Sequence, residues 1–309
     1  MRPPAATTLT RIHDDLAAIE AGDGDGEVRI GRTRLAVSSL GKVWFPADGI
    51  TKGDVLRYYV DVARVMLPLL ADRPLVLRRF PSGIDGPSFH QHDAGTPPPG
   101  VRAEPVPGVS DDPRFIGGDL TTLLYTVQLG ALSVHCWNAR VTAPDEADWI
   151  TLDLDPGPKA PFARTIAMAH EVRRHLDAEG LTAFCKTSGS RGLHLLAAVP
   201  GATSADDARA IAVRVAEATA ASTPAEATTA RTVADRAPDA VYIDAQQNAP
   251  GKTVVAPWSV RARPGATVST PLDWDEVVEG LDPRAFTIRT VLDRLPASRG
   301  WGRGLRGSR

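Results

Sequence analysis

The chain has 309 residues, of which 43% are hydrophobic and 23% are charged, and its formal net charge is −2. This length suffices for one large domain or two small ones, and the composition is typical of a globular protein. The sequence contains no run of about 18 apolar residues and no apolar signal core at its N-terminus, so we expect neither a membrane span nor secretion. We therefore expect a cytoplasmic protein. The near-neutral charge does not by itself indicate a nucleic-acid binder.

The N-terminal part of the chain predicts an extension followed by the start of a folded domain. Residues 1–29 end in a Gly/Asp-rich segment that is typical of a flexible linker. Thr51 and Asp54 have the spacing of a capping box, and apolar residues recur after them at helical intervals as far as Leu70. We therefore predict a helix there. The Pro/Gly-rich residues 95–114 predict a long loop, of a length that is usually either functional or disordered.

Later segments alternate between helical and strand patterns without a regular βαβ order. Helices are predicted over 120–129, 162–179 and 204–220. Strands are predicted by the segments PLVLRRF, ALSVHCW, WITLDLD and AVYID. This mixture indicates an α+β fold. We take residues 30–295 as one catalytic domain and the basic residues 296–309 as a flexible tail.

Three aspartates at strand ends are candidate metal ligands. Asp153 and Asp155 are two residues apart on a predicted strand, so both carboxylates point to the same side. Two such carboxylates repel unless a cation lies between them, and Mg²⁺ or Mn²⁺ prefers oxygen ligands. Asp244 ends another predicted strand and could complete the set. The alternative is that all three are solvent-facing acids at strand ends.

A second group of polar residues would suit a triphosphate. The segment from Lys186 to His194 is rich in Gly and Ser, and its backbone N–H groups could form an anion nest. It is not a Walker loop, and a simple β-hairpin would look similar. Gln247 and Arg261 follow Asp244 and add further donors. On the strand ALSVHCW, His135 is either a site residue or part of the core.

Taken together, these segments resemble the polymerase domain of bacterial DNA ligase D, within the archaeo-eukaryotic primase superfamily. The resemblance runs from about residue 30 to 280 and includes KVWFPADGITKGD, PLVLRRFPSGIDGPSF, GALSVHCWNARV, DLDPGP, KTSGSRGLHL and IDAQQNAPGKTVVAPWSVRARPGATVSTPL. It implies a core of two mixed or antiparallel sheets flanked by helices. We expect a stand-alone form without ligase or nuclease segments.

The resemblance also implies roles for individual residues. Asp153, Asp155 and Asp244 would be the catalytic ligands of two Mn²⁺ or Mg²⁺ ions. The residues that would contact the incoming nucleotide are Arg78, His135, Ser188, Arg191, His194, Gln247 and Arg261. The residues that would contact DNA are Lys42 and Lys52, at a 5′ phosphate, and Phe89 and His90, at the template. His90 stands where the family has a second aromatic residue, and His92 where it has a lysine.

The implied function is template-directed addition of nucleotides, chiefly ribonucleotides, to 3′ ends at gaps or double-strand breaks in DNA. The implied partners are DNA with a 5′ phosphate, nucleoside triphosphates, the end-binding protein Ku and a separate ligase, and we expect a nucleoid-associated monomer. Three other functions remain open from the sequence. The chain could be a primase that starts strands without a primer, a non-catalytic scaffold that binds DNA ends, or a metal phosphohydrolase.

Overall fold

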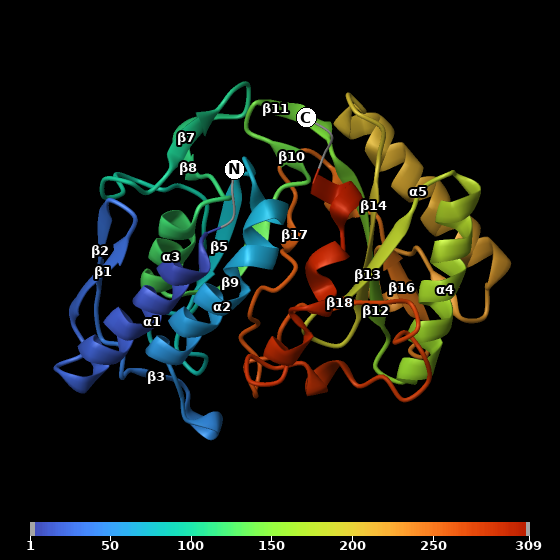
Figure 1. Cartoon of the computed structure of the whole chain (residues 1–309). Helices are drawn as coiled ribbons and strands as arrows, with labels where there is room; N and C mark the ends of the chain where they lie inside the picture. Colours follow the sequence, from blue (N-terminus) through green and yellow to red (C-terminus); the bar gives the residue numbers. More distant parts are fainter. Residues whose placement is uncertain (1–3, 307–309) are drawn as a thin grey trace.

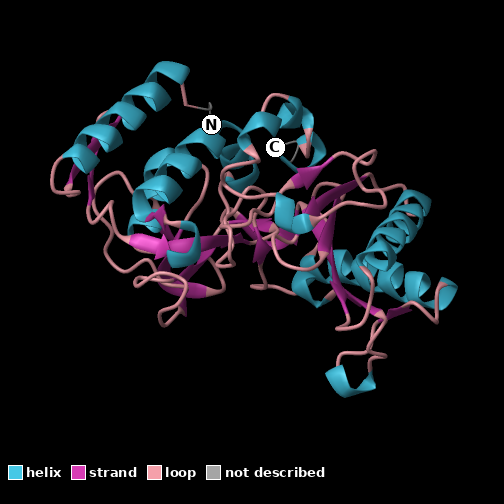
Figure 2. Ribbon diagram, turned by 90° about the horizontal axis from the view of Figure 1, so that it is seen from below, coloured by secondary structure: helices cyan, strands magenta, loops and turns pink. Residues whose placement is uncertain are grey.

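The computed structural model describes residues 4–306 and has two main β-sheets lying side by side, each covered by helices (Figures 1 and 2). The first is a mixed six-stranded sheet in the order β15-β16-β12-β14-β13-β18, in which only the β15–β16 pair is parallel. The second is an antiparallel four-stranded sheet in the order β17-β9-β5-β6. These observations confirm the expected α+β class.

The strands of the six-stranded sheet are β12 (Trp149–Pro156), β13 (Ala183–Thr187), β14 (Leu193–Ala198), β15 (Ala227–Thr228), β16 (Val241–Asp244) and β18 (Pro271–Leu272). Those of the four-stranded sheet are β5 (Leu75–Arg79), β6 (Phe89–Gln91), β9 (Ala131–Cys136) and β17 (Val254–Val255). Two-stranded hairpins are formed by β1 (Gly26–Ile30) with β2 (Thr33–Val37), β3 (Val43–Phe45) with β4 (Ile50–Thr51), β7 (Ala103–Val106) with β8 (Ser110–Phe115), and β10 (Ala139–Arg140) with β11 (Ala143–Ala147).

The α-helices in residues 4–306 are α1 (Ala6–Ala21), α2 (Lys52–Leu70), α3 (Leu120–Gln128), α4 (Phe162–Ala178) and α5 (Ala205–Ser222). The capping box predicted at Thr51 is present, because its hydroxyl accepts from Asp54 N and the Asp54 carboxylate accepts from Thr51 N. Ser204 caps α5 through Asp207 N. Helices α4 and α5 pack together on the outer face of the six-stranded sheet, while α2 and α3 cover the four-stranded sheet (Figure 1).

Within residues 4–306, both terminal segments contribute apolar side chains to the core. Helix α1 buries Ile12 and Leu16 in the same core as α2, and the expected linker is a short turn that leads directly into β1. At the other end, Trp301 and Leu305 are buried, so residues 296–306 differ from the flexible tail that we expected. The reason is that the two apolar side chains among the basic residues reach the core. The last three residues of the predicted tail lie outside the described residues.

Candidate active site

The six-stranded sheet brings four chemically active side chains into one row. Asp244 on β16 is the register partner of Asp153 on β12, which in turn faces His194 on β14. His194 is the partner of Lys186 on β13. Directly paired residues of neighbouring antiparallel strands lie on the same face of a sheet, with Cβ atoms about 4.5–5.5 Å apart. Residues from distant parts of the chain therefore form a continuous line of charged and polar groups.

Asp155 extends this row into a cluster of negative charge. It lies two positions beyond Asp153 on β12 and thus projects from the same face. Burial and then the Asp153 carboxylate raise the pKa of Asp155 to about 6, and Asp244 contributes in the same direction. Burial alone would raise the pKa of Asp153, but His194, and more weakly Lys186, lower it below its ordinary value. The cluster is therefore one where a cation would relieve repulsion.

The donors of this cluster fit a hard divalent cation, although residues 4–306 contain no ready-made group of three or more His, Cys, Asp or Glu ligands. Asp153 Oδ1 is buried and receives no aligned hydrogen bond from a described residue. Asp244 Oδ2 accepts from Gln247 Nε2 at 3.1 Å, and its Oδ1 accepts from Gln246 N at 2.7 Å. Carboxylate oxygens in a partly buried site are what Mg²⁺ or Mn²⁺ requires.

An open cleft of about 330 Å³ lies against this row. Its wall includes eight of the residues predicted from the sequence: His135, Asp153, Asp155, Ser188, Arg191, His194, Gln247 and Arg261. Ser190, Thr253 and Arg263 also line it, and we did not predict them. Ser190 belongs to the Gly/Ser segment, and Arg263 is a second arginine two positions after Arg261. Both residues could therefore have been predicted from the sequence. The cleft thus joins carboxylates to cationic and hydroxyl donors.

The turn between β13 and β14 is shaped by Ser188 and two glycines. Ser188 Oγ accepts from both Ser190 N and Gly192 N at 3.1 Å, so these two amides are not available to the anion nest that we expected. The hydroxyl hydrogen of Ser188 is left to donate. Gly189 has a φ of +66°, and a Cβ at Gly192 would lie 2.1 Å from the Leu154 carbonyl oxygen. Only glycine lets this turn approach β12 so closely.

The second sheet supplies His135, and the segment after β17 supplies Arg261. Burial and then Arg261 lower the pKa of His135 to about 3, so its imidazole is neutral at physiological pH. Arg261 donates to the Ser188 carbonyl at 3.2 Å, which links the two walls. Arg78 is exposed on β5, paired with His90 on β6, and does not line the cleft.

The predicted DNA-contacting residues lie away from the cleft lining. Phe89 is exposed on β6, with the Arg79 guanidinium 5.1 Å from its ring, and His90 is exposed next to it. Lys42 is exposed, whereas Lys52 is buried and donates to the Ser38 carbonyl at 2.8 Å. Burial and then Lys42 lower the pKa of Lys52 to about 8. The ammonium groups of Lys42 and Lys52 are close enough to interact electrostatically. Two lysines that contact the same phosphate group would have to lie this near to each other.

Lys186 lies behind the site and was not among the predicted site residues, because the sequence indicated it only as the start of the Gly/Ser segment. The side chain is fully buried, and its Nζ lies 2.7 Å from His194 Nδ1. A lysine on a strand normally indicates an exposed face. The usable signal was its place in the hairpin, because Lys186 and His194 are equidistant from the turn and therefore face each other.

Comparison with known proteins decides the family. Residues 51–300 match the family model described as the LigD primase-polymerase domain. The chain belongs to the LigD primase-polymerase domain family. It is 36% identical over 274 residues to the multifunctional non-homologous end joining DNA repair protein LigD of Mycobacterium tuberculosis strain H37Rv, covering 85% of this chain and 36% of that protein. It is 32% identical over 263 residues to the bifunctional non-homologous end joining protein LigD of Bacillus subtilis strain 168, covering 85% of this chain and 42% of that protein.

The fold agrees with this assignment. The solved polymerase domain from Mycobacterium tuberculosis ligase D, in complex with DNA, superposes with a TM-score of 0.83 at 33% identity, covering 89% of this chain and 99% of that one. The chain spans less than half the length of the two LigD proteins named above. This LigD-type polymerase domain has, within residues 4–306, no helix long and apolar enough to cross a membrane.

Proposed function

We propose that this LigD-type domain adds nucleotides, chiefly ribonucleotides, to DNA 3′ ends at short gaps or double-strand breaks, directed by a template. The observation that carries the proposal is the pairing of Asp153 with Asp244, because Asp153 and Asp155 lie on the wall of a cleft that also presents guanidinium and hydroxyl donors. Membership of the LigD primase-polymerase family and the end-joining names of the relatives support it.

In this proposal, Asp153, Asp155 and Asp244 hold two Mn²⁺ or Mg²⁺ ions. When bound, such a pair supplies charge neutralisation at the attacking 3′ hydroxyl and at the leaving pyrophosphate. The fit rests on the raised pKa of Asp155 and on the buried Asp153 Oδ1, which lies 3.2 Å from His194 Nε2 without an aligned hydrogen bond. Gln247 keeps Asp244 in place by donating to its second oxygen.

The chain's own cationic and polar residues bind the triphosphate. Arg191 and Arg261 present guanidinium donors to the cleft, and Arg groups can grip phosphate through two parallel hydrogen bonds. The Ser188 hydroxyl and the His194 imidazole add neutral donors at the same wall. Because these groups are fixed by the turn and the sheet, the triphosphate is oriented before the reaction begins.

DNA contacts follow from the exposed residues at the edge of the second sheet. Phe89 offers a face for base stacking and His90 offers a weaker one, and Arg78 on β5 is the register partner of His90. Lys42 and Lys52 would hold a 5′ phosphate across the gap. We further propose that end joining involves Ku and a separate ligase.

The experiment is an extension assay on gapped duplexes with and without a 5′ phosphate, in Mn²⁺ or Mg²⁺, with ribo- and deoxyribonucleotides. Asp155→Ala should reduce incorporation to background, whereas Asp177→Ala, a half-exposed carboxylate on α4 paired with Arg173, should leave it unchanged. Unprimed single-stranded template tests priming in the same assay. Full activity of Asp155→Ala would refute the proposed site.

A further inference from the structure

Lys186 is buried beside the active site without touching the cleft. Its Nζ is 2.7 Å from both His194 Nδ1 and Ser269 Oγ, and no carboxylate in residues 4–306 forms an ion pair with it. Burial, and then the charge of Arg261, lower its pKa to about 7. A lysine is rarely buried in this way unless its contacts require it. Its role must therefore pass through the two groups that it contacts.

The direction of these hydrogen bonds follows from Ser269. The Ser269 hydroxyl donates to the Thr187 carbonyl at 2.9 Å, so toward Lys186 its oxygen can only accept. In its ammonium form, Lys186 has three hydrogens and no lone pair, so it must also donate to His194 Nδ1. A hydrogen on Nδ1 would place two donors against each other at 2.7 Å, so this nitrogen is the acceptor and the ring is neutral. A neutral imidazole that accepts at Nδ1 carries its hydrogen on Nε2.

The Nε2 atom of His194 faces the reacting groups. It lies 3.2 Å from Asp153 Oδ1, but the two are not aligned for a hydrogen bond. His194 is among the residues that line the open cleft, and Lys186 is not. A hydrogen on Nε2 would therefore lie beside Asp153, at the wall of the cleft.

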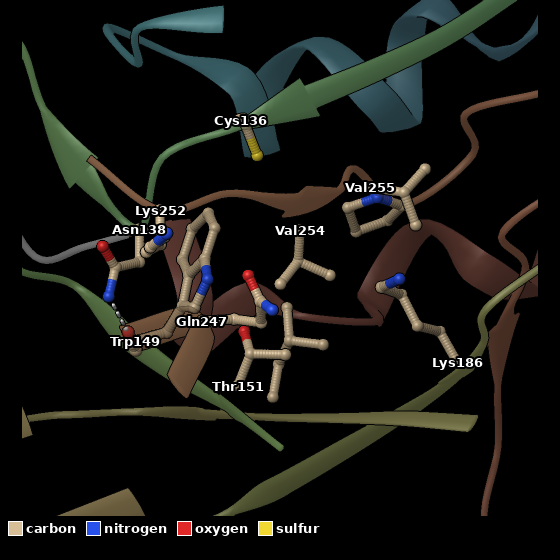
Figure 3. Close-up of a pocket in the computed structure, with 11 residues that line it drawn as sticks. Cys136, Asn138, Trp149, Thr151, Lys186, Gln247, Lys252, Val254 and Val255 are labelled. Carbon is tan, nitrogen blue, oxygen red and sulfur yellow. Dashed lines mark hydrogen bonds between the residues drawn. The ribbon is translucent and has the colours of Figure 1, made fainter. Parts of the chain in front are cut away.

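Lys186 instead borders a separate small cavity behind the site. This cavity has a volume of about 10 Å³, on the scale of one water molecule, and Thr151, Gln247 and Val254 are among its lining residues. Figure 3 shows the Lys186 amine pointing toward it from β13. A nucleotide is far too large for this space, so Lys186 does not contact the substrate there.

We propose that Lys186 is a positioning residue that holds His194 in the Nε2–H form, with this hydrogen presented to the incoming triphosphate. The part that concerns the triphosphate rests on the proposed function, whereas the choice of tautomer does not. Without Lys186, neutral His194 can carry its hydrogen on either nitrogen or rotate its ring. The outer contacts of a histidine fix its tautomer and orientation in just this way at metal sites.

The first test measures the tautomer directly in the metal-free full chain labelled with ¹⁵N histidine. Two-bond ¹H–¹⁵N correlation should show His194 protonated on Nε2 in the wild type and a mixture, or the Nδ1–H form, in Lys186→Met. The control is Cys185→Ala, which alters the opposite, buried face of the same strand and should leave the tautomer unchanged. An unchanged tautomer in Lys186→Met would overturn the proposal. Lys186→Leu, which also removes every donor, replaces it if the Met variant does not fold.

The second test separates positioning from general destabilisation. Lys186→Met should lower kcat/KM for the nucleotide by about tenfold, the scale of losing an outer contact to a site histidine. In a His194→Gln background, where no tautomer exists, the same change should have little further effect. Equal losses in both backgrounds would show that Lys186 does not act through His194. If the wild-type protein shows no extension at all, the proposed function is wrong. The NMR experiment would still test the tautomer of His194, because it does not depend on activity.

Discussion

Asp153 and Asp244 are direct cross-strand partners on β12 and β16, so two carboxylates from distant parts of the chain lie side by side on one face of the sheet. Paired like charges destabilise a sheet. The structure keeps them together with Asp155, beside cationic groups that include Arg191 and Arg261. Such an arrangement costs stability in the absence of cations, and several consequences can be measured.

Replacing Asp155 should stabilise the metal-free protein at neutral pH. The pKa of Asp155 is raised to about 6 in the folded state, whereas in the unfolded state it is near 4. The contribution of this carboxyl group to stability is therefore fully present below pH 4 and is lost as the pH rises through 6. Asp155→Asn should therefore raise Tm at pH 7.5 by about 2 °C, after discounting for solvent screening. The advantage should shrink toward pH 4. In Mn²⁺ the wild type should have the higher Tm, because binding of the ion stabilises the wild type but not Asp155→Asn. A lower Tm of the metal-free variant at pH 7.5 would contradict the repulsion.

Gly192→Ala should disrupt the turn that carries Ser188. The added Cβ would lie 2.1 Å from the Leu154 carbonyl oxygen, so β12 or the turn must shift. We expect destabilisation of about 1–3 kcal/mol by denaturant unfolding, and loss of extension beyond what the stability change explains. Gly201→Ala is the matched control, because nothing lies within 4 Å of its Cβ position. Equal behaviour of the two variants would argue against this constraint.

The preference for a 5′-phosphorylated gap should weaken at alkaline pH. Lys52 has its pKa lowered to about 8 by burial and then by Lys42, so its charge is present below pH 8 and lost above it. The ratio of extension on phosphorylated and unphosphorylated gaps should fall between pH 7 and 9. Lys42→Ala should lower this ratio at every pH. A ratio that stays constant up to pH 9 in the wild type would exclude Lys52 from phosphate binding.

Trp301→Ala should destabilise the whole domain. The indole is buried, donates from Nε1 to the Cys185 carbonyl at 3.1 Å and meets Phe184 edge to face at 5.7 Å. Loss of a buried tryptophan costs about 3–5 kcal/mol, which chemical denaturation would detect. Arg303→Ala, at an exposed position of the same segment, should change the unfolding free energy by less than about 0.5 kcal/mol. If Trp301→Ala left the unfolding free energy unchanged, the result would instead favour the flexible tail that the sequence predicted.

The sequence by itself predicted four of the five α-helices within residues 4–306 and several of the residues that line the cleft. The capping box at Thr51 and the apolar spacing after it are local features, formed by groups a few residues apart, so a helix over 52–70 follows from them. The motifs around Asp153, Ser188 and Asp244 likewise indicated which side chains would matter. Several of these residues do line one cleft.

Only the tertiary structure decided how those residues meet. The register that pairs Asp153 with Asp244 and His194 is set by burial across the whole sheet, and a slip of one residue would turn the aspartates to the opposite face. Burial also decided that Lys186 lies behind His194 and that Trp301 closes on Cys185. Spacing along the chain carries no information about such contacts, because they depend on which apolar surfaces distant segments bury together.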